Sequence, residues 1–341
     1  MTDLKDWQDI SEDFADTLIL GNGASIAVHR DFNYKSLRGA ALKRGYITDE
    51  VQEVFDDLGT EDFELVLNML WHAERVNRAL EVEETVTKKA YEDVKEALVK
   101  SVRDLHCEYS VAEPHLPAIY EFMGRFKTVL SLNYDLIAYW ALLAGNAQYG
   151  GYRFKDCFTD GTHLDPNWER LREPLGSLSE TTLVFYPHGN LVLTANPIEG
   201  DRKVAREAES EQLLDRILEA WEKGEGFPLF VSEGEWRQKL RAIQRSGYLS
   251  TVYSSVMSDL RTTATVYGWA MTGNDRHILD RVLRTPKETV AVSVHGPSTN
   301  NLDRHCRRIT SSIADSANRM HTPMPKIEFF DAESAECWIN S

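Results

Sequence analysis

Short runs of consecutive apolar residues recur along the chain, and most of them end in a turn that precedes a helical pattern. Runs of this kind, rich in β-branched and aromatic residues, predict strands that are buried on both faces of a parallel sheet. The predicted strands lie at 17–20, 128–132, 182–186, 227–232, 264–270, 288–294 and 326–330. The predicted helices lie at 135–144, 235–246, 275–284, 299–319 and 333–339. This alternation predicts an α/β fold with a Rossmann-like, doubly wound and mainly parallel sheet, in a single domain spanning 1–341.

Three stretches interrupt the alternation of strands and helices. Residues 34–126 are helical in pattern and predict an inserted helical subdomain, because apolar residues recur at i, i+3, i+4, i+7 and i+8 from position 63. Residues 149–180 have weak periodicity and many Gly, Asp, Thr and Pro, which predicts a long loop that is a candidate lid; ordinary disorder is the alternative. Residues 196–226 are highly charged and predict one or two surface helices as a second insertion.

The composition is that of a folded globular protein. Hydrophobic residues make up 42% of the 341 positions, enough to bury a sizeable core, so disorder is not the expected state of the chain. The sequence has no run of about 18 apolar residues that could span a bilayer. Residues 1–17 are acidic and polar, unlike a secretory signal. A cytoplasmic protein without membrane contact is therefore predicted.

The formal net charge of −16 argues against direct nucleic-acid binding, because phosphate backbones repel an acidic surface. Residues 45–74 carry nine acids and no Lys or Arg. A solvated helical face is the favoured interpretation of this segment, and an assembly surface for a basic partner is the alternative. The four cysteines form no CxxC pair, which excludes the common zinc-ribbon spacings and gives no disulfide framework, so no metal is predicted.

The first predicted strand ends in a glycine-rich turn, Gly21-Asn22-Gly23-Ala24-Ser25, which leads into a predicted helix. Glycines in such a turn let the backbone approach a phosphate closely, and the N-terminus of the helix supplies free N–H groups. The ordinary dinucleotide-binding fingerprint has a third glycine, at a place where this chain has Ile. The alternative is a turn that is rich in glycine only because it packs tightly.

Polar residues and a further glycine follow other predicted strands. Asn133 and Asp135 come after 128–132, His188 comes after 182–186, and Gly268 lies in the run 264–270. The carboxyl ends of parallel strands line the ligand crevice of an open α/β sheet, so these residues are predicted to lie there. His188 is a candidate general base, because histidine titrates near neutral pH. The alternatives are that residues 133–135 only cap a helix, that His188 is a loop histidine without a role, and that Gly268 only forms a strand-to-helix turn.

In their order along the chain, these four signals resemble the sirtuin family, and most closely the sirtuin-like NAD hydrolases that bacteria use in antiphage defence. The resemblance covers about 17–30, 128–145, 182–193 and 264–280, which is the scaffold without the insertions. It implies that Gly21, Gly23, Ala24 and Ser25 hold the diphosphate of NAD, and that Gly268 lines the adenosine side. Position 22 is Asn where the family usually has Ala, so the fit of the turn differs in detail.

The same resemblance implies the catalytic roles. Asn133 would face the nicotinamide ribose and position water, Asp135 would orient a ribose hydroxyl or its neighbours, and His188 would be the base. The zinc-binding cysteine pairs of deacetylating sirtuins are absent, which favours hydrolysis of NAD to ADP-ribose and nicotinamide over peptide deacetylation. An antiviral effector that depletes NAD is therefore expected, as a homo-oligomer or beside a partner ATPase or phage-sensing protein. The alternatives are a non-catalytic sensor or assembly subunit that binds NAD or ADP-ribose and, behind it, an ADP-ribosyltransferase or deacylase.

Overall fold

The structure is a computed structural model, and all statements below concern the residues that it describes. These residues are 4–33, 36–151, 153–159, 162–176, 178–196, 200–204, 210–224, 226–231, 234–296 and 299–340.

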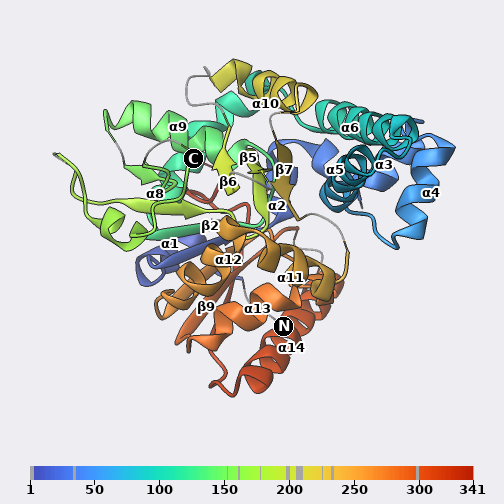
Figure 1. The fold of residues 1–341 in the computed structure, drawn as a ribbon. Helices are drawn as coiled ribbons and strands as arrows, with labels where there is room; N and C mark the ends of the chain where they lie inside the picture. Colours follow the sequence, from blue (N-terminus) through green and yellow to red (C-terminus); the bar gives the residue numbers. More distant parts are fainter. Residues whose placement is uncertain are drawn as a thin grey trace.

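A seven-stranded parallel sheet forms the centre of the molecule (Figure 1). Its order is β10-β9-β8-β1-β2-β4-β3, and every neighbouring pair runs parallel. The strands are β1 (Thr17–Leu20), β2 (Thr128–Ser131), β3 (Phe154–Lys155), β4 (Thr182–Phe185), β8 (Thr263–Tyr267), β9 (Thr289–Val294) and β10 (Lys326–Asp331). The predicted α/β, Rossmann-like class is confirmed. The chain order reverses at β1, which pairs with β2 on one side and with β8 on the other.

Helices between the strands cover this sheet. Figure 1 shows α8 and α9 in the upper part of the molecule and α11 to α14 in the lower part, with strands running between them. The helices outside residues 34–126 are α1 (Trp7–Ile10), α2 (Asn22–Val28), α9 (Ile137–Gln148), α10 (Leu213–Glu222), α11 (Trp236–Arg245), α12 (Gly247–Ser254), α13 (Arg276–Arg284) and α14 (Thr299–Met320). Single 3₁₀ turns lie at Ser11–Asp13, Arg30–Phe32, Glu113–His115, Trp168–Arg172, Ser210–Gln212, Val256–Ser258 and Gly273–Asp275.

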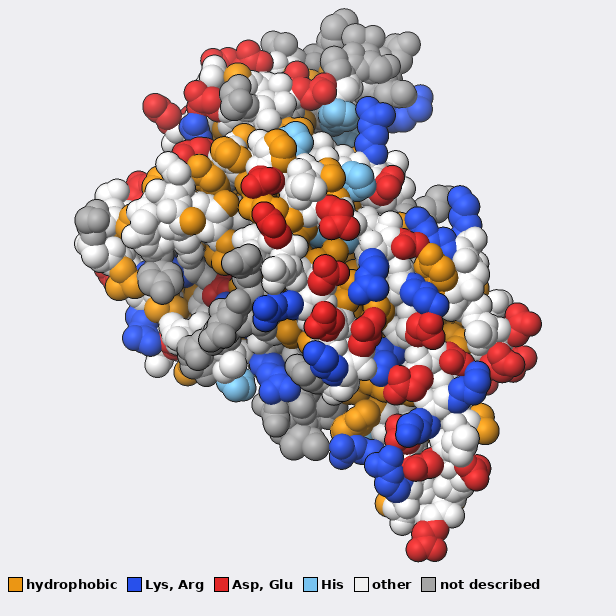
Figure 2. Space-filling view, turned by 90° about the horizontal axis from the view of Figure 1, so that it is seen from above, with side chains coloured by type: hydrophobic (Ala, Val, Ile, Leu, Met, Phe, Trp, Pro, Cys, Tyr) orange, Lys and Arg blue, Asp and Glu red, His pale blue; other side chains and the backbone are white. Residues whose placement is uncertain are grey.

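The segment between α2 and β2 is helical, as predicted for 34–126. It contains α3 (Leu37–Lys43), α4 (Asp49–Asp57), α5 (Phe63–Ala79), α6 (Thr85–Leu105), α7 (Tyr109–Ala112) and α8 (Leu116–Gly124). Figure 1 shows α3 to α6 gathered at one edge of the molecule, whereas α8 packs against α9. The acids of this segment are not all solvated, because Asp62 caps α5 and burial raises its pKa to about 6. On the face shown in Figure 2, Lys and Arg side chains lie among the Asp and Glu side chains.

A second, antiparallel sheet corrects two of the predictions. It has the order β6-β5-β7, with β5 (Gly189–Asn196), β6 (Gly200–Lys203) and β7 (Phe227–Phe230). The run 227–232 was predicted to join the large sheet, but β7 pairs with β5 because the chain turns back directly after β4. In the described part of the predicted charged helical segment 196–226, Asn196 ends β5, Gly200–Lys203 forms strand β6, and Leu213–Glu222 forms helix α10.

Two further predictions concern segment 333–339, expected to be a helix, and segment 149–180, expected to be a long loop. No helix forms at 333–339, because Glu336 and Trp338 have positive φ angles of 59° and 56°, which a right-handed helix excludes. The described part of 149–180 holds β3 and a 3₁₀ turn, and Lys155 there donates to the carbonyls of Leu171 and Glu173. This segment lies at the β3 edge of the sheet. Its role as a lid stays a prediction.

Candidate functional site

The candidate site lies at the carboxyl ends of the central strands, where the chain order reverses. Gly21 follows β1, Asn133 follows β2, His188 follows β4 and Gly268 follows β8. All four line one cavity of about 450 Å³, together with Gly23. The structure therefore brings together residues from four separate parts of the sequence at the place where open α/β sheets bind ligands.

The glycines of the first turn are required by backbone packing against the β8 turn. A Cβ atom on Gly23 would lie 2.7 Å from the Cα of Gly268, and one on Gly21 would lie 2.5 Å from the Cα of Trp269. Gly268 has a φ of +68°, and its own Cβ would lie 2.3 Å from the amide nitrogen of Ala24. Tight packing thus accounts for these glycines, and a phosphate over them stays a prediction.

The N-terminus of α2 is less available than the sequence suggests. The N–H of Gly23 donates to the carbonyl of Gly268 at 2.8 Å, and the N–H of Ala24 donates to the carbonyl of Gly21 at 2.9 Å. The hydroxyl of Ser25 donates to Asp135 at 2.5 Å and is buried. The N–H groups of Gly21, Gly23 and Ala24 and the hydroxyl of Ser25 therefore all donate inside the protein, so fewer donors remain for a diphosphate than the sequence predicts.

We expect Gly23→Val to lower the melting temperature by several degrees and to abolish binding of ADP-ribose, because its side chain must displace the backbone of Gly268. Differential scanning fluorimetry and titration calorimetry measure the two effects. Gly273→Val is the matched control, because no atom lies within 4 Å of a Cβ built there. A Gly23→Val protein that melts like the wild type would contradict this assignment of the turn.

The side chain of Asn133 connects β2 to the turn after β1. Its amide Nδ2 donates to the carbonyl of Gly21 at 3.0 Å and to the hydroxyl of Ser25 at 2.8 Å. These two acceptors use both amide hydrogens, so the oxygen Oδ1 is left as the acceptor that a ligand or water can use. Asn133 lines the cavity and is half-buried. Asn133 is therefore not a helix cap, which was the alternative interpretation.

Asp135 has the capping role instead. One carboxylate oxygen accepts from the backbone N–H of Ile137 at the start of α9, and the other accepts from the hydroxyl of Ser25. Burial raises the pKa of Asp135, and these hydrogen bonds oppose that rise. The carboxyl group thus holds Ser25, and Ser25 in turn holds Asn133. Asp135 is positioned to orient its neighbours and to close the floor of the cavity.

His188 lies beside a second histidine that the sequence analysis did not select. The Nε2 atoms of His188 and His277 are 3.0 Å apart, and both side chains are buried. Burial holds the pKa of His188 well below its ordinary value, and the positive charge of Lys239 lowers it further. Burial also lowers the pKa of His277 to about 4. Both rings are therefore neutral at pH 7, and one N–H is shared between the two Nε2 atoms.

An ion pair forms the opposite wall of the cavity. Lys239 on α11 donates to Asp275 at 2.9 Å, and the indole of Trp269 donates to the same carboxylate at 3.2 Å. Burial tends to raise the pKa of Asp275, but the positive charge of Lys239 and the hydrogen bonds from Lys239 and Trp269 hold that pKa below its ordinary value. The carboxylate is thus ionised beside the histidine pair. Only the nearness of Asp275 and His277 to Gly268 in the sequence could have indicated them, and nothing in the local pattern singles out Lys239.

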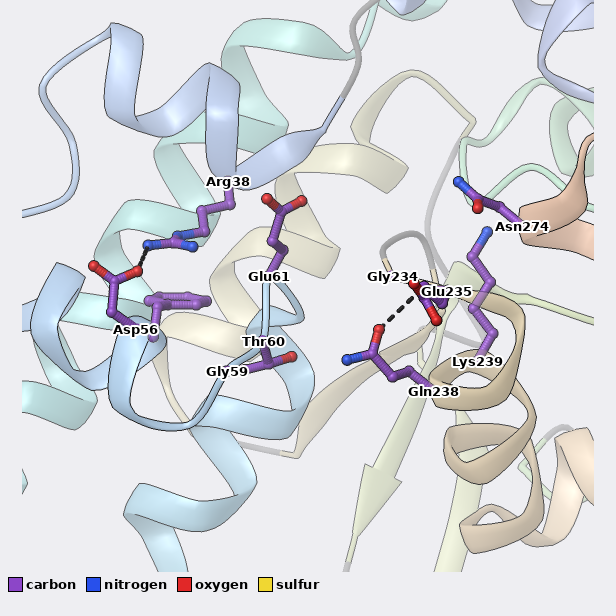
Figure 3. Close-up of a pocket in the computed structure, with 11 residues that line it drawn as sticks. Arg38, Asp56, Gly59, Thr60, Glu61, Gly234, Glu235, Gln238, Lys239 and Asn274 are labelled. Atoms are coloured by element: carbon purple, nitrogen blue, oxygen red, sulfur yellow. Dashed lines mark hydrogen bonds and ion pairs between the residues drawn. The ribbon is translucent and has the colours of Figure 1, made fainter.

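Lys239 also borders an outer cleft of about 460 Å³ between the helical insertion and the α/β body. Figure 3 shows Arg38, Asp56 and Glu61 from the insertion on one side, and Glu235, Lys239 and Asn274 on the other. Arg38 is paired with Asp56, so its guanidinium is turned toward the insertion. Because Lys239 lines both spaces, it lies where the outer cleft meets the inner cavity.

A second cavity, of about 670 Å³, lies on the other side of the glycine turn. It extends over the carboxyl ends of β8, β9 and β10 and is lined there by Ser293, His295 and Glu333. Five residues line this cavity and the inner one alike: Gly23, Ile26, Gly268, Trp269 and Ala270. The two cavities therefore adjoin across the β1 and β8 turns. Position 26, where the usual fingerprint has glycine, contributes an isoleucine side chain to both.

These features define an α/β protein with a two-part ligand crevice at the switch point of a parallel sheet. The chain belongs to the family described as Domain of unknown function (DUF4917), which matches residues 18–338. The matched range contains every candidate site residue. No curated protein matches the sequence significantly. Within the described part of the chain, no helix is long and apolar enough to cross a membrane, and no group of three or more His, Cys, Asp or Glu side chains is arranged to hold a metal ion.

Proposed function

We propose that the protein binds NAD across the two adjoining cavities and hydrolyses it to ADP-ribose and nicotinamide. The observation that carries this proposal is the pair of cavities that meet at Gly23 and Gly268. A dinucleotide has two bulky halves joined by a narrow diphosphate, and the crevice has two wide parts joined over a strip of glycine backbone. The nicotinamide ribose would occupy the inner cavity beside Asn133, and adenosine would occupy the second cavity, over the carboxyl ends of β8, β9 and β10.

The residues of the inner cavity suit cleavage of the bond between nicotinamide and ribose. That cleavage builds positive charge on the sugar, and water must reach the anomeric carbon. The Oδ1 atom of Asn133 is held in place by the contacts of its amide with Gly21 and Ser25, so it can accept a hydrogen bond from this water or from a ribose hydroxyl. The ionised carboxylate of Asp275 lies in the wall of this cavity, paired with the positive charge of Lys239.

His188 is the candidate for the proton acceptor. In its neutral form it can take a proton from water or a ribose hydroxyl, and Asp275 stabilises the resulting imidazolium while Lys239 opposes it. Its Nε2 atom already faces His277, so the acceptor is a pair of rings rather than a single one. A ligand must therefore compete with His277 for the Nε2 atom of His188, which is occupied in the unliganded site.

The direct test is to incubate the purified full-length protein with NAD and to measure nicotinamide by liquid chromatography, while calorimetry measures the binding of ADP-ribose. Release of nicotinamide together with binding of ADP-ribose supports the proposal. A protein that binds neither NAD nor ADP-ribose contradicts it. The resemblance to defence enzymes further suggests depletion of NAD during phage infection, which is tested by NAD measurement in infected cells with and without the protein.

A non-catalytic sensor of NAD or ADP-ribose is the second candidate function, and one observation favours it. The groups expected to do chemistry are partnered inside the protein: Ser25 with Asp135, and His188 with His277. A site that only binds nucleotide could keep these contacts unchanged. Tight binding of NAD without release of nicotinamide, both alone and in a lysate of infected cells, would favour the sensor.

Lys239 offers a pH test of the histidine assignment. We expect Lys239→Met to raise the pKa of His188, because loss of a nearby positive charge favours the protonated ring and leaves Asp275 unpaired. The acidic limb of the pH–rate profile should therefore move to higher pH. Histidine NMR titration and nicotinamide release measure the two shifts. Lys287→Met, which removes another buried lysine that lines neither cavity, should leave both unchanged.

A further inference from the structure

The hydrogen bond between His188 and His277 has a direction, and the surroundings of the two rings determine it. The bond joins the two Nε2 atoms at 3.0 Å, and each neutral imidazole carries one N–H, so one ring donates and the other accepts. The Nδ1 atom of His277 is buried and has no hydrogen-bond partner in the described part of the chain. The backbone carbonyl of Leu132, which can only accept, interacts with the imidazole of His188.

One arrangement of the two hydrogens suits these neighbours. If His277 carries its hydrogen on Nε2, it donates to His188, and the hydrogen of His188 is left for the carbonyl of Leu132. The reverse arrangement would bury an N–H at Nδ1 of His277 without an acceptor and would deprive Leu132 of its donor. His277 is therefore the donor, and the lone pair on Nε2 of His188 is the acceptor.

His277 is not arranged to pass a proton onward. A relay through an imidazole needs a hydrogen-bond partner at each ring nitrogen, and Nδ1 of His277 has none among the described residues. Burial also opposes a positive charge on this ring, because it lowers the pKa of His277 to about 4. Within the pair of rings, His188 is thus the one that can accept a proton, and His277 occupies the atom that would accept it.

Fixed backbone on both sides holds the two rings together. His277 lies in the first turn of α13, and its carbonyl accepts from the hydroxyl of Tyr253 at 3.2 Å. The carbonyl of His188 accepts from the N–H of Val231 at 2.7 Å, and the next residue, Gly189, has a φ of +78° that few other residues adopt. Breaking the contact therefore requires rotation of a side chain rather than a shift of either backbone.

We propose that His277 is a positioning residue that restrains the site, because its Nε2–H occupies the nitrogen with which His188 would accept a proton, and a bound ligand must displace it. This inference rests on the proposed function, since it concerns the proton acceptor of the same cavity. A ribose hydroxyl or a water that donates to His188 replaces the N–H of His277, so binding breaks one buried hydrogen bond. Removal of that donor should therefore raise both the affinity and the rate.

His277→Phe tests the inference, because phenylalanine fills the space of the imidazole with a ring that has no N–H. The affinity for ADP-ribose and the kcat/KM for nicotinamide release from NAD should both rise about 5-fold, the usual net worth of one hydrogen bond. His277→Gln returns an N–H donor to the same region and should bring both values back toward those of the wild type. Calorimetry and liquid chromatography measure them, and thermal melting shows that each variant is folded.

A double variant separates the restraint from a general effect of the new side chain. In a His188→Ala background, adding His277→Phe should change neither affinity nor rate, because the acceptor that His277 occupies is no longer there. A gain that persists without His188 would overturn the inference. Nitrogen-15 NMR of the free, histidine-labelled protein should show a hydrogen on Nε2 of His277 and none on Nε2 of His188, and the opposite pattern would also overturn it.

The outcomes distinguish this inference from the proposed hydrolysis. If the wild type releases nicotinamide and His277→Phe binds and reacts no better, the restraint is wrong and hydrolysis stands. If His277→Phe binds ADP-ribose more tightly than the wild type but neither protein releases nicotinamide, the restraint stands and hydrolysis is wrong. If neither protein binds ADP-ribose, both are wrong.

Discussion

Replacement of His188 with alanine should lower the rate of nicotinamide release from NAD by about 10²–10⁴-fold, the usual contribution of a positioned proton acceptor. The neutral ring is the form that can accept a proton, and burial keeps it neutral at pH 7. The loss should fall on kcat and leave the affinity for ADP-ribose close to that of the wild type, because the glycine turns and the second cavity are unchanged. Steady-state kinetics and calorimetry measure the two quantities.

His106 provides the matched control for this variant. It is also a buried histidine whose pKa burial lowers to about 4, but its ring bonds the backbone of Leu136 and Cys107 and lines neither cavity. His106→Ala should therefore lower the melting temperature without a comparable loss of rate per folded molecule. Normal nicotinamide release from His188→Ala would show that His188 is not the proton acceptor.

Replacement of Asn133 with alanine should cause a rate loss of similar size, about 10²–10³-fold, through lost positioning of water and ribose. The structure adds a second cause, because the amide of Asn133 holds the carbonyl of Gly21 and the hydroxyl of Ser25. A purely structural role would instead lower the melting temperature and leave the rate per folded molecule almost unchanged. Nicotinamide release measured beside thermal melting separates these two outcomes.

Asn133→Asp is the informative companion variant. It keeps the size and an oxygen acceptor but loses the amide hydrogens that reach Gly21 and Ser25, and it places a charge next to Asp135. Activity should be lost as in the alanine variant. The double variant with His188→Ala should lose less than the product of the two single effects, because both residues serve one step. Strictly multiplicative losses would show that they act in different steps.

The large sheet could be predicted because its strands are buried on both faces, and such strands appear in a sequence as unbroken apolar runs. Strand β5 (Gly189–Asn196) was missed because only residues 186–188 separate it from β4, and β6 was missed because Gly200–Lys203 is polar and looks like part of a charged helix. Strand β7 was found but assigned to the wrong sheet, because an apolar run does not reveal its pairing partner. The end of the chain was mispredicted because left-handed backbone at Trp338 has no local signal.

The position of the candidate site at the strand ends was predictable. The side chains that reach it from other elements and the internal hydrogen-bond partners were less so. Asn133, Asp135, His188 and Gly268 could be found because each follows an apolar run, and parallel strands bring such positions together. Lys239 could not be found, because it enters from a helix whose approach to the cavity depends on the whole fold, and His277 was indicated only by its nearness to Gly268 in the sequence. The internal partners of Ser25 were also hidden, since a hydroxyl near a strand end has no preferred partner in the sequence.

The last turn of the described chain bears on when the site can form during synthesis. The indole of Trp338 is buried and donates at 2.8 Å to the carbonyl of Ala24, and Ser334 accepts from the backbone N–H of Trp7. The turn after β1 is thus completed by residues that the ribosome adds more than three hundred positions later. Because chains fold from the N-terminus as they are made, a nascent chain would hold an unfinished crevice until residue 338 has emerged. Under the proposed function, incomplete copies would therefore not hydrolyse NAD.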